Sequence, residues 1–131
     1  MTKTQKKILV VDDDALMREL LKAILKDEGF NVVGEAKDGQ AALAQLEKLG
    51  PELVCLDVNM PGMSGLDVLK AIQKAAPSTR VVMITGDASM TTVREAVSYG
   101  AAGYIIKPFN QVRVGQAVRA ALSAPSDSPF S

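Results

Sequence analysis

The sequence predicts an α/β fold of the (βα)5 type, in which the five strands of one doubly wound parallel sheet alternate with five helices. Two observations predict this fold. Short apolar runs rich in β-branched residues recur five times, and the segments between them carry apolar residues at helical spacing. Most of the runs are continuous rather than alternating, as in parallel strands that helices cover on both faces.

The expected strands and helices follow one another in strict order along the chain. Strands are expected at residues 8–11, 32–33, 53–56, 81–84 and 104–106. The apolar stripes of the helices run through residues 16–25, 42–49, 69–76, 90–97 and 114–122. Glycines that tolerate the left-handed conformation follow three of these stripes, at Gly29, Gly50 and Gly100. N-terminal caps are expected at Asp14, Asp38, Ser64 and Asn110.

The alternation of strands and helices also predicts the strand order. Right-handed crossovers place helices on both faces of the sheet, and the common solution for five strands is the flavodoxin-like order 2-1-3-4-5. Ligands bind such sheets outside the carboxyl ends of the strands, at the point between the first and third strands where the order reverses. The residues that end those two strands are residues 12–14, all aspartates, and Asp57.

Composition excludes several classes of function. The 131 residues hold 15 Lys and Arg against 15 Asp and Glu, so bulk charge favours neither nucleic acid nor an anionic membrane. The chain has no histidine and one cysteine, which excludes disulfides within the chain, Cys/His zinc sites and a resident imidazole. The basic start is followed by an apolar run too short for export, which predicts a cytoplasmic protein. We expect one domain over residues 1–124 and a disordered tail or truncated linker over residues 125–131.

Three aspartates are expected to meet at one edge of the sheet. Asp12 and Asp13 should lie beside Asp57, because the first and third strands are neighbours in this order. Carboxylates this close repel one another unless a cation lies between them. Few oxygen ligands, completed by water or phosphate, suit Mg²⁺ better than Ca²⁺. Asp14 is expected only to cap the first helix.

Two further polar residues end the fourth and fifth strands, on the other side of Asp57. We expect Thr85 and Lys107 there, opposite the acidic pair. The Thr85 hydroxyl and the Lys107 ammonium would lie on one side of Asp57 and the divalent ion on the other. Together they would surround a group attached to Asp57 whose negative charge is spread over several atoms. A phosphoryl group fits, since a carboxylate can attack phosphorus to form an acyl phosphate.

Four motifs resemble the receiver domains of two-component response regulators, in particular the single-domain CheY-like type. They are ILVVDDD (8–14), LDVNMPGMSG (56–65), ITG (84–86) and GYIIKPF (103–109), in the family's order and spacing. The resemblance covers roughly residues 6–123. It implies that Asp57 is the phosphoacceptor, that Asp12, Asp13 and the backbone carbonyl of Asn59 hold Mg²⁺ with it, and that Thr85 and Lys107 contact the phosphoryl group. It also implies a switch role for Thr85 and Tyr104, and a cis bond before Pro108.

The resemblance also implies partners. The phosphoryl donor would be a sensor histidine kinase or a phosphotransfer protein, and a downstream target would bind the face formed by the fourth helix, fifth strand and fifth helix. The protein would catalyse only its own phosphoryl transfer and dephosphorylation. Asn59 and Asp87 resemble the CheY pattern and predict a short-lived phosphoryl state. Ala102 and Gly103 replace the paired acids of many dimerising regulators, which favours a monomer or weak dimer.

Other functions stay open to different degrees. The chain can be a receiver cut from a longer regulator, and its pathway is not specified. A phosphohydrolase of the haloacid-dehalogenase type would need a second acid where Asn59 stands. A flavin mononucleotide carrier would need a Ser/Thr-rich loop after the first strand, where the chain has three aspartates, and aromatic cover for the ring, but the chain has no tryptophan.

Overall fold

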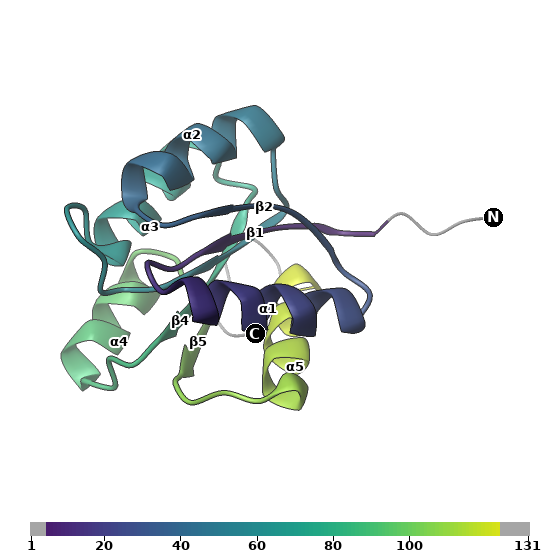
Figure 1. Ribbon diagram of the computed structural model, residues 1–131. Coiled ribbons are helices and arrows are strands. Elements are labelled where there is room, and N and C mark those ends of the chain that lie inside the picture. Colours follow the sequence, from purple (N-terminus) through teal and green to yellow (C-terminus); the bar gives the residue numbers. More distant parts are fainter. Residues whose placement is uncertain (1–4, 124–131) are drawn as a thin grey trace.

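The computed structural model describes residues 5–123, which form five strands and five helices in alternation (Figure 1). In chain order they are β1 (Lys7–Val11), α1 (Ala15–Asp27), β2 (Asn31–Ala36), α2 (Gly39–Leu49), β3 (Leu53–Leu56), α3 (Gly65–Ala75), β4 (Arg80–Thr85), α4 (Met90–Ser98), β5 (Gly103–Ile106) and α5 (Gln111–Ser123). Residue 124 and the predicted tail, 125–131, lie outside the described residues.

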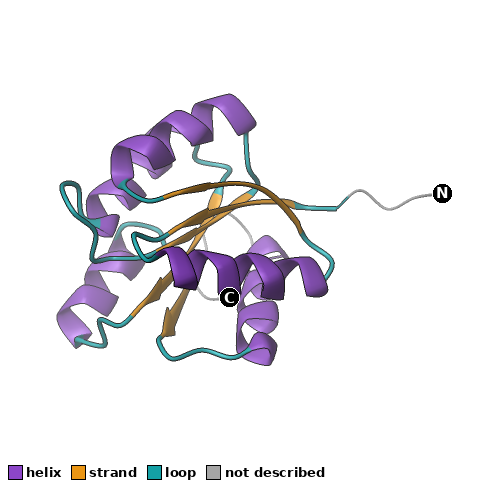
Figure 2. Ribbon diagram, viewed as in Figure 1, coloured by secondary structure: helices purple, strands orange, loops and turns teal. Residues whose placement is uncertain are grey.

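The strands form one parallel sheet in the order β2-β1-β3-β4-β5, which confirms the predicted topology. Helices α1 and α5 pack on one face of the sheet, and α2, α3 and α4 pack on the other (Figures 1 and 2). Among residues 5–123, no helix combines the length and the apolar character needed to cross a membrane.

The two-sided cover explains the continuous apolar runs. In β1, Ile8 and Val10 face the core under α1 and α5, whereas Leu9 and Val11 face the core under α2 and α3. All four side chains are fully buried, or nearly so. Because successive residues of a strand point to opposite faces, a strand covered on both faces has no polar positions.

Strand β2 is longer than the sequence predicts. It runs from Asn31 to Ala36 rather than over residues 32–33, and it lies at the edge of the sheet. Its second half contains Gly34 and Glu35, which carry no strand pattern. A Cβ atom at Gly34 would lie 2.7 Å from Cδ1 of Leu49, so packing against α2 explains the glycine.

The predicted helix caps are present. Side-chain oxygens at the N-termini of four helices accept a hydrogen bond from a backbone N–H two or three residues later, at Asp14, Asp38, Ser64 and Asn110. Ser89 caps α4 in the same way and was not predicted. Glycines with positive φ follow α1, α2 and α4, at Gly29, Gly50 and Gly100. These signals fix the helix ends, so the loops that carry polar groups begin at defined positions.

Candidate functional site

The carboxyl ends of β1 and β3 bring together three aspartates, here called the acid cluster: Asp12, Asp13 and Asp57. Val11 pairs with Leu56 in the sheet, so the residues that follow, Asp12 and Asp57, leave it side by side. One carboxylate oxygen from each aspartate lies within 4.8 Å of the other two. Asp12 and Asp57 are buried and Asp13 is exposed. The cluster therefore has one side open to solvent.

Lys107 binds two members of the acid cluster. Its Nζ lies 2.8 Å from Oδ2 of Asp12 and 3.2 Å from Oδ2 of Asp57. This differs from the expectation that Lys107 faces the acidic pair from across Asp57. The backbone does follow β5, where Lys107 N–H donates to the Thr85 carbonyl, but the long side chain contacts both Asp57 and Asp12, whose opposite charges attract it. The peptide bond between Lys107 and Pro108 is cis, as the resemblance implied.

One ammonium does not balance three carboxylates. Burial raises the pKa of Asp12, the hydrogen bond from Lys107 works against this shift, and the nearby charge of Asp57 adds to it. Burial alone would lower the pKa of Lys107, but the hydrogen bond with Asp12 and the charges of both aspartates outweigh it and raise that pKa. The cluster keeps an excess of negative charge. Its oxygen donors fit a divalent cation such as Mg²⁺, which takes a few carboxylates and keeps several waters.

The loop after β3 holds Asp57 in place. The backbone N–H of Asn59 donates to Oδ1 of Asp57 at 3.3 Å. The metal contact of the Asn59 carbonyl stays a prediction. Gly65, at the start of α3, lies so close to this loop that a Cβ atom there would sit 1.9 Å from the Asp57 carbonyl oxygen. Sequence reasoning missed Gly65, although a glycine directly after the cap Ser64 is a signal of close backbone approach.

Thr85 and Tyr104 meet at one residue of the loop after β4. Thr85 is fully buried, and its Oγ1 accepts a hydrogen bond from the Asp87 N–H at 3.2 Å. The Tyr104 hydroxyl donates to the Asp87 carbonyl at 2.6 Å. Burial raises the pKa of Tyr104 to about 12, so it stays a donor at neutral pH. Asp87 thus links both predicted switch residues through its backbone, a role its residue type does not indicate.

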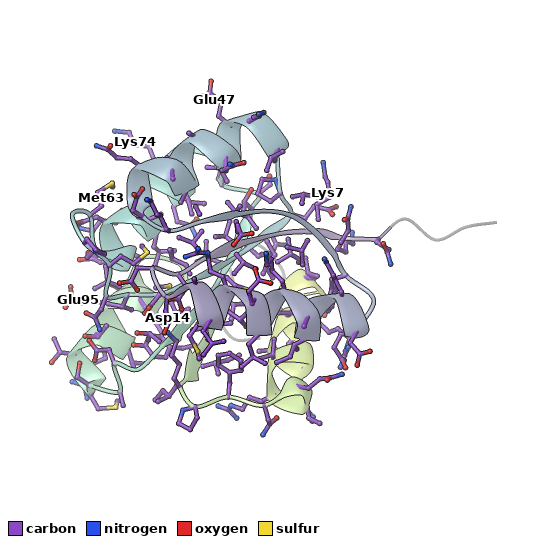
Figure 3. The ribbon with its side chains drawn as sticks, in the orientation of Figure 1. Lys7, Asp14, Glu47, Met63, Lys74 and Glu95 are labelled. Carbon is purple, nitrogen blue, oxygen red and sulfur yellow. The ribbon has the colours of Figure 1, made fainter. Side chains whose placement is uncertain are left out.

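Asp13, the exposed member of the acid cluster, borders a cavity of about 570 Å³. Asp13 lines it together with Lys37, Asp38 and the loop of residues 61–63. Asp14 and Met63 mark this end of the molecule, where the strands have their carboxyl ends, and Lys7 marks the other (Figure 3). A ligand in this cavity can therefore contact Asp13.

Comparison with known proteins agrees with this geometry. Residues 8–119 match the family model of the response regulator receiver domain. The chain is 38% identical to the chemotaxis protein CheY of Thermotoga maritima over 113 residues, which are 86% of this chain and 94% of that protein. It is 46% identical to CheY-3 of Vibrio cholerae over 105 residues, 79% of this chain and 81% of that protein.

Solved structures agree as well. A CheX-CheY-BeF3-Mg²⁺ complex from Borrelia burgdorferi contains a chain that superposes with a TM-score of 0.87 at 30% identity, over 91% of this chain and 90% of that one. The family match covers every motif and every strand except the first residue of β1. The chain therefore belongs to the receiver domains of response regulators and is of the CheY type.

Proposed function

We propose that the protein is a phosphorylatable receiver whose Asp57 accepts a phosphoryl group from a phosphohistidine on another protein. The observation that carries the proposal is the acid cluster, in which Lys107 binds two of three carboxylates and the third, Asp13, is exposed. The chain has no histidine, so the phosphohistidine belongs to a partner, a sensor histidine kinase or a phosphotransfer protein.

The transfer needs little from the protein beyond position and charge. A carboxylate oxygen of Asp57 attacks the phosphorus, an O–P bond forms, and the P–N bond of the donor breaks with its electron pair left on the imidazole nitrogen. Lys107 is placed to neutralise phosphoryl oxygens, since its Nζ already contacts Oδ2 of Asp57. The Thr85 hydroxyl would donate to the same group.

Residues Asp12, Asp13 and Asp57, with the Asn59 carbonyl, would hold Mg²⁺. When bound, Mg²⁺ would neutralise the excess charge of the cluster and the charge of the transferring group. The solved complex of a CheY from Borrelia burgdorferi with BeF3 and Mg²⁺ supports this assignment. Water attacking the phosphorus would return Asp57 and release inorganic phosphate. The polar side chains of Asn59 and Asp87 favour a short-lived phosphoryl state, and no separate substrate is turned over.

Phosphorylation would act on the face of α4, β5 and α5 through the Asp87 backbone. A phosphoryl group on Asp57 attracts the Thr85 hydroxyl, which then no longer accepts from the Asp87 N–H. The loop shifts, the hydrogen bond from Tyr104 to the Asp87 carbonyl is lost, and the ring turns inward. A downstream protein would read this change of shape. A cytoplasmic monomer or weak dimer that binds no nucleic acid suits this role.

Intact-mass measurement tests the phosphoacceptor. Incubation with acetyl phosphate and Mg²⁺ is expected to add one phosphoryl group to the wild type and none to Asp57→Asn. Asp67→Asn, an identical change at an exposed position of α3, is the matched control and should carry the adduct. An adduct that survives in Asp57→Asn would overturn the proposal, and chelation of Mg²⁺ is expected to remove the wild-type adduct.

Tyrosine fluorescence tests the switch, because the chain has no tryptophan and only two tyrosines. Phosphorylation by acetyl phosphate is expected to change the emission of the wild type. Tyr104→Phe should keep the mass adduct and lose most of the change, with Tyr99 as the internal reference. A full change in Tyr104→Phe would rule out the switch role of Tyr104.

A further inference from the structure

We infer that Arg18 is a positioning residue for the divalent cation site, acting through the backbone of Asp12. The inference rests on the proposed function, because it concerns the same cation. Arg18 lies in α1 and does not belong to the acid cluster. One of its terminal nitrogens, Nη1, donates to the Asp12 carbonyl oxygen at 2.8 Å, and its Nε donates to Oε1 of Glu35 at 2.8 Å. The guanidinium therefore joins the loop after β1 to the edge strand β2.

Every polar atom of Asp12 has a partner. Its N–H donates to the Ala36 carbonyl at 3.1 Å, and its carbonyl accepts from Arg18. On the side chain, Oδ1 accepts from the Asp14 N–H at 2.9 Å and Oδ2 accepts from Lys107. A cation bound to the carboxylate would compete with the last two contacts. The contacts to Ala36 and Arg18 would remain, together with the hydrogen bond from the Asp57 N–H to the Val11 carbonyl at 3.1 Å. Of these, only the contact with Arg18 comes from a side chain and holds the Asp12 carbonyl itself.

The positive charge of Arg18 is balanced by acidic side chains next to it. Arg18 belongs to a salt-bridge network that joins α1 to β2, formed by Arg18, Glu19, Lys22 and Glu35. Glu35 accepts from both Arg18 and Lys22, and Glu19 accepts from Lys22. Two acids and two cations make the network neutral. The guanidinium can therefore hold the Asp12 peptide with little repulsion of a divalent cation nearby.

A merely structural role and a positioning role predict opposite changes in Mg²⁺ affinity. If Arg18 only ties α1 to β2, its loss removes a positive charge near the site and leaves Mg²⁺ affinity unchanged or slightly higher. If Arg18 positions Asp12, its loss lowers Mg²⁺ affinity in spite of the removed charge. The side chain of Arg18 is 17% exposed, and its contact with the Asp12 carbonyl is partly buried.

Calorimetric titration with Mg²⁺ separates these roles. Arg18→Met is expected to bind Mg²⁺ about three- to tenfold more weakly than the wild type. Loss of a residue that binds a metal ligand typically lowers metal affinity about 10- to 100-fold. The loss is expected to be smaller here because removing the positive charge of Arg18 favours Mg²⁺ binding. Lys22→Met is the matched control, since it removes a cation from the same network without touching Asp12. Its affinity is expected within about twofold of the wild type or tighter. Thermal unfolding of each variant records the change in stability separately.

Arg18→Lys gives a second test that does not depend on Arg18→Met folding. A lysine keeps the charge, but its single nitrogen cannot bind both the Asp12 carbonyl and Glu35 in the geometry of the guanidinium. We expect Mg²⁺ affinity at least as low as in Arg18→Met. Wild-type affinity in either Arg18 variant overturns the positioning role alone. A wild type that binds no Mg²⁺ overturns the cation site of the proposed function as well.

Discussion

Asp12 lies between two groups of charged side chains that are built differently. On one side is the acid cluster, where Lys107 is the cation bound by Asp12 and Asp57. On the other side is the salt-bridge network of α1 and β2, in which acids and cations are equal in number. Asp12 belongs to the first group by its carboxylate and contacts the second by its carbonyl.

The difference lies in burial and in balance of charge. The network is partly exposed and neutral, so it costs little to form and contributes little to the free energy of unfolding. The acid cluster buries two of its three carboxylates with an excess of negative charge, which costs stability. Charge that is neutralised within the protein is typical of a structural role, whereas carboxylates buried with an excess of negative charge are typical of a functional site.

The largest expected effect comes from moving Asp57 within the acid cluster. Gly65→Ala would place a Cβ atom 1.9 Å from the Asp57 carbonyl oxygen, so the loop that carries Asp57 must shift. We expect a loss of roughly 3 kcal/mol in the free energy of unfolding and little or no phosphoryl adduct. Urea unfolding and intact-mass measurement check the two parts.

Gly86→Ala is the control for this change. Gly86 follows Thr85 at the same end of the sheet, but a Cβ atom there meets no atom within 4 Å. Its stability and its adduct are expected to stay near those of the wild type. If Gly65→Ala were as stable and as readily phosphorylated as Gly86→Ala, close packing would not be what holds Asp57.

An intermediate effect should come from the cation itself. Mg²⁺ at ten times its dissociation constant is expected to raise the free energy of unfolding of the wild type by about 1.4 kcal/mol. Asp13→Asn should be more stable than the wild type without Mg²⁺, because repulsion within the acid cluster falls, and should lose most of the gain from Mg²⁺. Urea unfolding with and without Mg²⁺ measures both changes.

The salt-bridge network supplies the opposite case. Lys22→Gln removes one charge from a neutral group, so the metal-free protein should become slightly less stable while the gain from Mg²⁺ stays intact. The comparison between the two charged groups fails if Asp13→Asn and Lys22→Gln change stability in the same direction without Mg²⁺.

The strands and the acid cluster could be predicted because their signals are local or follow from strand order. Continuous apolar runs mark strands covered on both faces, and the order of the sheet then brings Asp12 beside Asp57. The second half of β2 was not predicted, because it contains Gly34 and Glu35, which carry no apolar strand pattern. An edge strand packed against the end of a helix can hold these residues.

Contacts that depend on side-chain reach or on backbone acceptors could not be predicted. The reach of Lys107 to Asp12 depends on local charge rather than on strand order. Arg18 binds a carbonyl oxygen and Asp87 binds Thr85 and Tyr104 through its backbone, and every residue type offers those backbone groups.

The smallest expected effect is on the pH dependence of the free energy of unfolding, to which the salt-bridge network and the acid cluster contribute with opposite signs. Hydrogen bonds from Lys22 and then Arg18 lower the pKa of Glu35 below its ordinary value of 4.5. Ionised Glu35 therefore stabilises the fold above pH 4.5, and this contribution is lost as pH falls through the lowered pKa of the folded state. Asp12 behaves in the opposite way, because burial raises its pKa above 3.8 and protonation relieves a cost of folding.

Glu35→Gln should thus be less stable than the wild type at neutral pH by a few tenths of a kcal/mol, since Glu35 is 37% exposed. The difference should shrink as pH falls through 4.5 and below, where wild-type Glu35 is protonated as well. Urea unfolding of both proteins over this range measures it. If the difference in stability between the two proteins stays constant or grows on acidification, the salt-bridge network does not act through the charge of Glu35. Charge balance would then not be what distinguishes this network from the acid cluster.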